Sequence, residues 1–488
     1  MHVSELPNGV PTRMLIGGLW VDAKDGSCTE VFDPATTDVL ATVPLAGESE
    51  AMDAVGVAYE AQPSWERRAP RERAEILRRS YELMVERAED IARVIVLENG
   101  KALVDARGEV AYAAEFFRWY AEEAVRQSGT IQRAPSGVNQ ILVLRQAIGV
   151  AVLVTPWNFP AAMATRKIAP ALAAGCSVIL KPATDTPLTA LLIAKILADA
   201  GVPDGVVNVL PARGSSNIVS MMLHDPRVRK LSFTGSTEVG RKLLHEAADT
   251  IISSSMELGG NAPFVVFADA DLDAAVAGAM VAKMRNGGEA CTAANRFYVE
   301  APVAKVFSEK LAAAMGALKV GPGLEEGTDV GPLINAEAQH KVESLVQDAL
   351  DRGATRLEQG EPYQGRGYFV RPLVLDSVDP DSQLLAEEIF GPVAPVTSFE
   401  GEEEAIALAN ATEFGLVSYL YTRDLARGLR VSEALEAGMI GLNRGLVSDP
   451  AAPFGGVKQS GLGREGGHEG VLEYTEAKYI ATSWSSPT

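Results

Sequence analysis

Apolar side chains recur every three or four residues between residues 70 and 127, with Glu, Arg and Gln between them. The clearest run consists of Val110, Ala113, Ala114, Phe117, Ala121 and Ala124. This spacing puts the apolar positions on one face of a helix. The pattern therefore predicts helices over residues 70–127, each with a buried face.

From residue 148 the pattern changes to short apolar runs that alternate with helical stretches. The runs are IGVAVLVTP (148–156), SVILKP (177–182), VVNVLP (206–211) and KLSFTG (230–235). A second series follows Gly259-Gly260, with strands predicted at 262–267 and 296–300 and helices at 271–286 and 302–318. Apolar strands that alternate with helices indicate βαβ units and a buried parallel sheet. Two α/β domains are therefore expected to meet near residue 260.

Two further segments look like isolated strands that belong to neither series. They are GVNQILVLRQ (137–146) and KYIATSW (478–484). Each would leave an exposed edge unless it paired with another strand. They either pair with each other and with another subunit, or extend the sheet of one of the domains.

Composition narrows the class of protein. With 488 residues the chain exceeds the size of one core. The net charge of −20 argues against nucleic acid as a partner, because phosphate binding needs clustered Lys and Arg. Three cysteines are too few for a disulfide framework, and no apolar stretch approaches the length of a membrane-spanning helix. The N-terminal residues lack the pattern of a signal peptide, so a cytoplasmic protein without a membrane partner is expected.

The segment MRNGGEACTAANR (284–296) contains the cysteine best placed for chemistry. Cys291 lies among small and polar residues rather than in an apolar environment. A cysteine nucleophile needs help to become a thiolate, but the five histidines have unremarkable contexts, and no metal-ligand spacing is present. Glu257, followed by two glycines, is a candidate base, although alone it could equally be a capping or surface carboxylate.

Three strand ends carry further candidates. Asn158, at the end of the strand near 148–155, could donate to an oxyanion, or WNFP could be a turn fixed by proline. Lys181 ends another strand and could bind a ribose or phosphate. A helix that begins near Ser236 would point free N–H groups at a phosphate, although the usual G-x-G-x-x-G motif is absent.

Taken together, these segments resemble the signature motifs of the aldehyde dehydrogenase superfamily. The motifs are PWNFP, KPATDTP, FTGSTEVG, MELGGNAP, GGEACTAANR, EEIFGPV and PFGGVKQSGLGRE, in this order, and the similarity runs from about Leu15 to Tyr479. The resemblance implies an α/β fold with a Rossmann-type cofactor domain (1–128 and 148–258), an α/β catalytic domain (259–445) and a small β oligomerisation flap (129–147 and 470–488). It also implies a homodimer or homotetramer.

The resemblance assigns chemistry to the candidates. Cys291 would attack the aldehyde carbon, Asn158 and the Cys291 backbone N–H would hold the oxyanion, and Glu257 would activate water. NAD(P)+ would accept the hydride. The cofactor-binding residues that it implies are Trp157, Lys181, Thr184, Gly235, Ser236, Leu258, Glu388 and Phe390.

Within the superfamily the sequence is most similar to succinate-semialdehyde dehydrogenases. That similarity implies that Arg166, Arg285 and Ser448 bind the distal carboxylate of a small anionic aldehyde, a role that suits an Arg fork. Arg166 could instead form an ion pair with a helix Glu. Other anionic substrates are glutarate semialdehyde, 2-oxoglutarate semialdehyde and sulfolactaldehyde. A non-catalytic structural descendant and a cysteine hydrolase are the alternatives from other classes.

Two positions suggest variations on the family pattern. Many NAD-preferring relatives carry a glutamate where Thr184 stands, so NADP is expected to be preferred, with NAD also accepted. The Thr184 hydroxyl is expected to donate to a phosphate. Glu289, two residues before Cys291, is expected to reshape the mouth of the pocket.

Overall fold

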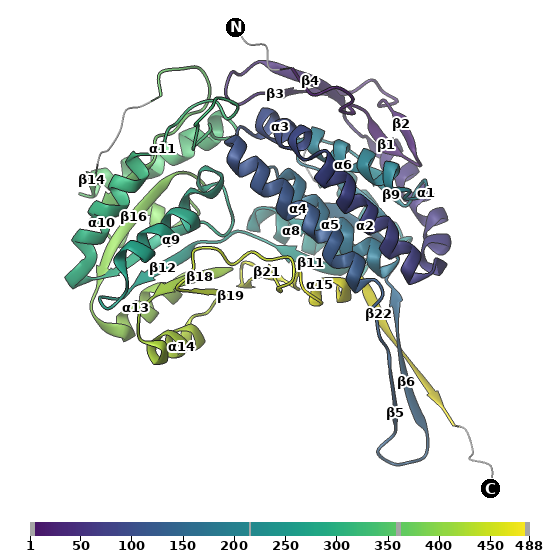
Figure 1. Cartoon of the computed structure of the whole chain (residues 1–488). Coiled ribbons are helices and arrows are strands. Elements are labelled where there is room, and N and C mark those ends of the chain that lie inside the picture. Colours follow the sequence, from purple (N-terminus) through teal and green to yellow (C-terminus); the bar gives the residue numbers. More distant parts are fainter. Residues whose placement is uncertain (1–4, 214–215, 358–362, 484–488) are drawn as a thin grey trace.

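The computed structural model describes residues 5–213, 216–357 and 363–483. Two large sheets covered by helices form the body of the molecule, and a small three-stranded sheet projects from it (Figure 1). The predicted α/β fold class is confirmed by this arrangement. The division into domains at residues 128, 148, 258 and 445 stays a prediction.

The first large sheet has a parallel centre. Its central strands, in spatial order, are β9 (Val207–Val209), β8 (Val178–Lys181), β7 (Val150–Val154), β10 (Val228–Thr234) and β11 (Ser253–Glu257). These strands confirm the apolar runs predicted between 148 and 235. One edge carries β1 (Met14–Ile16) and β2 (Leu19–Val21), and the other carries β21 (Gly461–Leu462), antiparallel to β11. Pairing with β21 brings the segment near residue 461 beside Glu257.

The second large sheet is parallel except at one edge. In spatial order it contains β14 (Thr355–Leu357), β15 (Leu373–Asp376), β16 (Val393–Phe399), β13 (Ala294–Glu300), β12 (Ala262–Val266), β18 (Val417–Tyr421) and β19 (Met439–Leu442). Helices α9 (Leu272–Met284) and α10 (Ala301–Gly316) flank β13 in sequence. The helix predicted over 271–286 is wrong at its end. The α-helix stops at Met284, and Asn286 has a φ of 53°, which is not helical. Residues 285–291, which follow the helix and end in Cys291, are called the nucleophile segment below.

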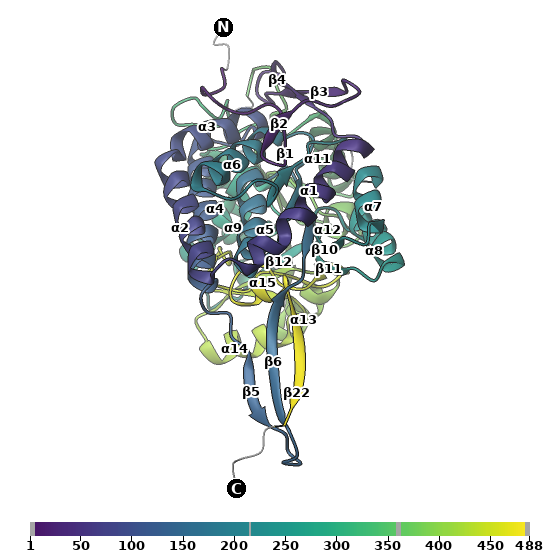
Figure 2. The ribbon, with the colours of Figure 1, turned by 90° about the vertical axis from the view of Figure 1, so that its right-hand side faces the viewer.

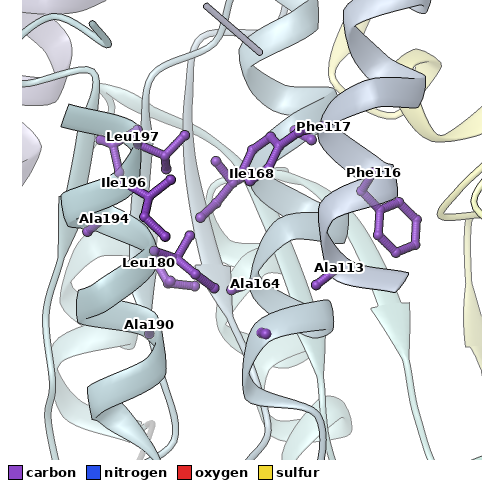
Figure 3. Packing of buried hydrophobic residues seen from close by; sticks show 14 of the residues in the cluster. Ala113, Phe116, Phe117, Ala164, Ile168, Leu180, Ala190, Ala194, Ile196 and Leu197 are labelled. Atoms are coloured by element: carbon purple, nitrogen blue, oxygen red, sulfur yellow. The ribbon is translucent and has the colours of Figure 1, made fainter. Parts of the chain in front are cut away.

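Helices pack on both faces of the first sheet. They are α1 (Glu48–Arg67), α2 (Pro70–Glu86), α3 (Ala88–Asn99), α4 (Leu103–Glu123), α5 (Pro160–Ala174), α6 (Pro187–Ala200), α7 (Ser216–His224) and α8 (Thr237–Asp249). The helices predicted within 70–127 are confirmed. Figure 3 shows α4, α5 and α6 side by side, where Phe117, Ile168 and Leu197 are completely or almost completely buried. This apolar contact holds α5, which begins two residues after Asn158.

The other elements are short or peripheral. The helices are the 3-10 turn Arg285–Gly288, α11 (Ala336–Asp351), α12 (Gln383–Ala386), α13 (Gly401–Asn410), α14 (Leu425–Ala434) and α15 (Glu469–Leu472). Two pairs of strands are β3 (Cys28–Phe32) with β4 (Val39–Pro44), and β17 (Phe414–Gly415) with β20 (Val457–Lys458).

Two buried carboxylates receive the first N–H groups of helices. Glu98 accepts from the backbone N–H groups of Leu188 and Thr189 at the start of α6, at 2.7 and 2.8 Å. Glu109 accepts from Ala161 and Ala162 at the start of α5, at 2.8 and 3.2 Å. The first turn of a helix has no partners of its own for these N–H groups, so each carboxylate ties a helix start to a neighbouring helix.

The two stray strands pair with each other, as one of the two sequence alternatives proposed. Strand β6 (Gln140–Ala147) lies between β5 (Thr130–Arg133) and β22 (Thr475–Thr482), antiparallel to both. This small sheet extends away from the body (Figures 1 and 2), and several of its apolar side chains are exposed, among them Ile131 and Tyr479. Residues 484–488 of the predicted flap lie outside the described residues.

No helix in the described ranges is both long enough and apolar enough to cross a membrane. A cytoplasmic location stays a prediction from the sequence.

Candidate active site

A cavity of about 530 Å³ lies where the strands of the first sheet end and the second sheet begins. Its wall contains Asn158 and Cys291 from the predicted catalytic set. It also contains the predicted cofactor residues Trp157, Gly235, Ser236, Leu258, Glu388 and Phe390. Residues that are far apart in the sequence therefore meet around one space, at the sheet edge where ligands bind in open α/β folds.

The same cavity has a wall that the sequence analysis missed. Ile334, Asn335, Glu337, Ala338 and Lys341 line it from the start of α11. The Asn335 side chain caps this helix by accepting from the Ala338 N–H at 3.0 Å. An Asn directly before a helical pattern was the available signal, but it indicates a helix start and not a ligand.

The structure offers groups that fit a dinucleotide in this cavity. The Thr234 hydroxyl is buried there and meets no hydrogen-bond partner within the described ranges. Ser236 caps α8, so the free N–H groups of that helix start face the cavity wall to which Gly235 and Ser236 belong. Trp157 and Phe390 make an edge-to-face contact, with ring centroids 5.4 Å apart, on the same wall. When bound, a nicotinamide cofactor would supply the hydride acceptor.

Lys181 and Thr184 lie near this site but are not among the residues that line the cavity. Lys181 ends β8, and burial lowers the pKa of its ammonium to about 8. The Thr184 hydroxyl donates to the carbonyl of Ala212 at 3.0 Å. This bond differs from the expectation that the hydroxyl serves a phosphate: the proton is already used, so Thr184 offers a neutral side chain rather than a donor.

The nucleophile sits at the end of a tight left-handed segment. Asn286, Gly287 and Gly288 have φ values of 53°, 60° and 85°. A Cβ at Gly288 would collide with the carbonyl oxygen of Gly391, so only glycine fits there. The Asn158 amide donates to the Glu289 carbonyl at 2.9 Å, which leaves its second N–H available. The amide is thereby oriented beside the nucleophile segment.

Glu289 does not shape the mouth of the pocket, contrary to the expectation from the sequence. Its side chain is buried and accepts from the Ile334 N–H at 3.1 Å. Burial raises the pKa of this carboxyl to about 8. Ile334 lines the 530 Å³ cavity on the side of α11, so this buried hydrogen bond connects the nucleophile segment to that wall of the cavity.

The Cys291 thiol is neutral in this structure. Burial raises its pKa to about 12, although the guanidinium groups of Arg166 and Arg285 favour the thiolate. These two cations oppose the effect of burial but do not overcome it. The thiol therefore needs a proton acceptor when it attacks.

Glu257, the predicted base, ends β11 and faces a buried group of charges. Burial, and then the nearby Glu465, raise the pKa of its carboxyl well above the ordinary value, while Arg166 and Lys167 favour its ionised form. Its Oε2 has no hydrogen-bond partner among the residues described. Glu257 is not one of the residues that line the cofactor cavity, yet it is close enough to influence the pKa of Cys291.

The charges beside Glu257 form a compact set around Glu465. Arg166 Nε lies 2.5 Å from Glu465 Oε2, and Lys167 Nζ donates to Glu465 Oε1 at 2.5 Å. Although burial disfavours its charge, the two cations hold the pKa of Glu465 below the ordinary value. The sequence analysis offered an ion pair with a helix Glu as the alternative role of Arg166. The structure shows an ion pair, but its partner Glu465 lies in the segment after β21 and not in a helix.

Arg285 and Ser448, two of the predicted substrate residues, line a second cavity of about 510 Å³. The Arg285 guanidinium lies over the rings of Phe159 and Tyr112, at 4.8 and 5.7 Å from their centroids. No carboxylate within the described part of the chain comes within ion-pair distance of it. Arg285 therefore has no carboxylate at ion-pair distance, although it is close enough to Asp105 of the same cavity to favour the ionised form of that carboxyl, while Arg166 is already paired.

The acidic groups of this second cavity have partners of their own. Glu109 pairs with Lys101, Asp105 accepts from the Asn286 N–H, and Asp329 accepts from the Lys319 N–H. Arg285 and Cys291 belong to one short segment, which contributes the cation to the second cavity and the thiol to the first. The arrangement is suited to a ligand that has a negative end and an electrophilic end.

Comparison with known proteins agrees with this geometry. Residues 20–480 match the model of the aldehyde dehydrogenase family, and the chain belongs to this family. It is an oxidoreductase of the aldehyde dehydrogenase type.

The relatives act on related aldehydes, according to their names. The chain is 56% identical to a succinate-semialdehyde dehydrogenase of Paenarthrobacter nicotinovorans, over 91% of this chain and 98% of that protein. It is 49% identical to a glutarate-semialdehyde dehydrogenase of Pseudomonas putida (96% and 97% covered) and 48% identical to the NADP(+) succinate-semialdehyde dehydrogenase of Escherichia coli (96% and 97%). A crystal structure of an aldehyde dehydrogenase from Brucella melitensis superposes with a TM-score of 0.97 at 48% identity, with both chains fully covered.

The resting state of Cys291 predicts slow alkylation. With a pKa of about 12, its thiolate fraction at pH 8 is roughly a thousandfold smaller than that of a thiol with a pKa near 8.5. Without cofactor, iodoacetamide should modify Cys291 at least about 100-fold more slowly than the exposed Cys28, with a rate that rises up to pH 10. Peptide mass mapping over time measures both sites. Rapid modification of Cys291 with a plateau below pH 9 would contradict the assignment of a neutral thiol.

Proposed function

We propose that this enzyme oxidises succinate semialdehyde to succinate, with NAD(P)+ as hydride acceptor. The observation that carries the proposal is the unpaired Arg285 guanidinium in a cavity next to the nucleophile segment. A small aldehyde with a carboxylate at its far end would place the carboxylate at Arg285 and the aldehyde carbon at Cys291. The names of the relatives support the same substrate class.

Under this proposal the Cys291 thiol gives its proton to the Glu257 carboxylate, Cys291 Sγ forms a bond to the aldehyde carbon, and the carbonyl oxygen becomes an oxyanion. Glu257 passes that proton to solvent before the hydrolytic step. The free N–H of the Asn158 amide and the backbone N–H of Cys291 donate to the oxyanion. Re-formation of the C–O double bond would expel hydride, for which a nicotinamide held in the first cavity would supply the acceptor, and would leave a thioester to Cys291. Water then adds to the thioester carbon and the C–S bond breaks, which releases succinate and the thiol.

Glu257 is the proposed base for the hydrolytic step. It must be ionised to accept a proton from water. Burial and Glu465 raise its pKa well above the ordinary value, and Arg166, Lys167 and Arg464 oppose this shift, so we expect hydrolysis to speed up as the pH rises through the pKa of Glu257. Hydrolysis of the thioester consumes one water and yields one carboxylate. No histidine is needed for either half of the reaction.

Arg285 and Arg166 have different proposed roles, whereas the sequence suggested that both bind the substrate. Arg285, with Ser448, holds the substrate carboxylate. Arg166 forms an ion pair with Glu465, and its guanidinium carbon lies 4.1 Å from the centroid of the Phe454 ring. Its proposed role is to favour the ionised forms of Glu465 and Glu257 rather than to bind the substrate.

Arg285→Ala tests the substrate assignment. The variant should raise KM for succinate semialdehyde at least about 30-fold, because the loss of one partner of a buried charge pair costs about 2–5 kcal/mol. Butanal, which has no carboxylate, should be oxidised nearly as well as by the unaltered enzyme. Absorbance of the reduced cofactor at 340 nm follows both reactions.

Arg166→Ala is the comparison variant, since it leaves Glu465 with Lys167 alone. It should impair both substrates together. Equal losses on both substrates in Arg285→Ala would remove the argument for a carboxylate anchor. If glutarate semialdehyde were oxidised with a much higher kcat/KM than succinate semialdehyde, the longer acid would replace it as the substrate.

NADP+ is the proposed preferred cofactor, with NAD+ also accepted. The support is the neutral side chain at position 184, close to Lys181 in the same segment. A glutamate there would repel the 2′-phosphate of NADP+. Because the Thr184 hydroxyl is bonded to Ala212, the absence of charge, rather than a hydrogen bond, is the proposed determinant.

Thr184→Glu should lower kcat/KM for NADP+ by at least about tenfold and change the value for NAD+ much less. Thr184→Val removes the hydroxyl without adding charge and should keep the preference. Steady-state kinetics with each cofactor measure the ratio. An unaltered enzyme that uses NAD+ alone, or a Thr184→Glu variant with full NADP+ activity, would refute the preference.

A homodimer or homotetramer formed through the projecting sheet is also proposed. The support is the exposure of Ile131 (72%) and Ile480 (39%) on a thin sheet that stands away from the body. Replacing both with Asp should shift the sedimenting species toward the 51.7 kDa monomer. Leu425→Asp, on the equally exposed surface of α14, is the control and should leave the oligomer intact. A monomeric unaltered protein would refute the assembly.

A further inference from the structure

Tyr112 contributes a phenol to the wall of the second cavity, and the functions proposed above give this residue no role. It lies on α4, and its ring makes an edge contact with Phe116 at 4.9 Å between centroids. The Arg285 guanidinium lies 5.7 Å from the centroid of the Tyr112 ring. The phenol is therefore a direct neighbour of the cation that the proposed function gives to the substrate carboxylate.

The Tyr112 hydroxyl is buried and finds no hydrogen-bond partner among the residues the structure describes. The two cations that favour its ionised form, Arg166 and Arg285, have N–H donors only. Its O–H proton thus has nothing to donate to. Burial raises the pKa of the phenol, so it keeps this proton at neutral pH.

A buried hydroxyl without an acceptor is uncommon and requires an explanation. Here the surroundings supply an explanation, because the Arg285 guanidinium, which has no ion-pair partner among the described residues, favours an anion next to the phenol. A carboxylate between Arg285 and the Tyr112 hydroxyl would accept from both. That ligand would satisfy the hydroxyl that the protein leaves unmatched.

We propose that Tyr112 donates its hydroxyl proton to the terminal carboxylate of the substrate and thereby helps the enzyme select anionic aldehydes. The inference rests on the proposed function, since it needs an acidic group in the second cavity. Tyr112 acts in binding only, because the reacting carbon is at the other end of the substrate.

Tyr120 provides a matched control on the same helix. Its hydroxyl is also buried and unmatched within the described residues, but Tyr120 lines neither cavity. Removing either hydroxyl takes one oxygen atom from α4. Only Tyr112→Phe removes a hydroxyl donor from a residue that lines the second cavity.

The experiment compares Tyr112→Phe and Tyr120→Phe with the unaltered enzyme on succinate semialdehyde and butanal, at saturating NADP+. Tyr112→Phe should raise KM for succinate semialdehyde at least about tenfold, as for the loss of a hydrogen bond to a charged group. Its KM and kcat for butanal should stay within about twofold. Tyr120→Phe should change neither substrate selectively.

Inhibition by the product gives a second measurement that does not depend on turnover of the acid. Succinate should inhibit butanal oxidation, and Tyr112→Phe should raise its inhibition constant by a similar factor. Equal effects on both aldehydes, or an unchanged inhibition constant for succinate, would overturn the role of Tyr112. If the unaltered enzyme showed no preference for succinate semialdehyde over butanal, the proposed function would fail as well.

Discussion

The buried ion pair between Lys101 and Glu109 holds the active site together. Lys101 Nζ donates to Glu109 and to the Asn158 carbonyl, each at 2.7 Å, and both side chains are fully buried. Glu109 in turn accepts from the first N–H groups of α5. A buried pair of this kind is stable only when its remaining hydrogen bonds are also made. Here those bonds fix the turn that carries Asn158, so the position of the amide proposed to hold the oxyanion depends on a buried ion pair.

The cations at the site are of two kinds. Arg166 and Lys167 pair with a carboxylate inside the protein, whereas Arg285 has no ion-pair partner among the described residues. Glu465 takes up the charges of Arg166 and Lys167, and this set determines how readily Glu257 ionises. Arg285, by contrast, forms no ion pair among the described residues and lies over two aromatic faces, which solvate a guanidinium without neutralising it. The two arginines have the same chemistry, and their different partners are the basis of the different roles proposed for them.

The order of elements and the location of the site were largely predictable from the sequence. Apolar runs identified the buried strands from 148 to 235, and Asn158, Lys181 and Ser236 were expected at the ends of such strands. The motifs that resemble aldehyde dehydrogenases brought Cys291, Glu388 and Phe390 to the same place. Local patterns were sufficient because each of these residues lies at, or within three residues of, the end of a regular element.

Contacts between distant segments could not be read from the sequence. The Arg166–Glu465 pair depends on β21 joining the edge of β11, and nothing in the short segment Gly461–Leu462 predicts that pairing. The bond from Thr184 to Ala212 and the burial of Glu289 against Ile334 depend likewise on loop packing. The wall at the start of α11 had only a helix-capping Asn as its signal. Side-chain partners, rather than elements, were therefore the unpredictable part.

The close backbone contacts around Cys291 bear on attempts to redesign the enzyme. A Cβ at Gly288 would strike the Gly391 carbonyl, and one at Gly260 would strike the carbonyl of Cys291 itself. Three chain segments are thus interlocked without any side chain between them, so random mutagenesis there should yield inactive protein rather than new selectivity. The cavity around Arg285 is walled instead by side chains of α4 and α9. Libraries aimed at other aldehydes belong on those two helices.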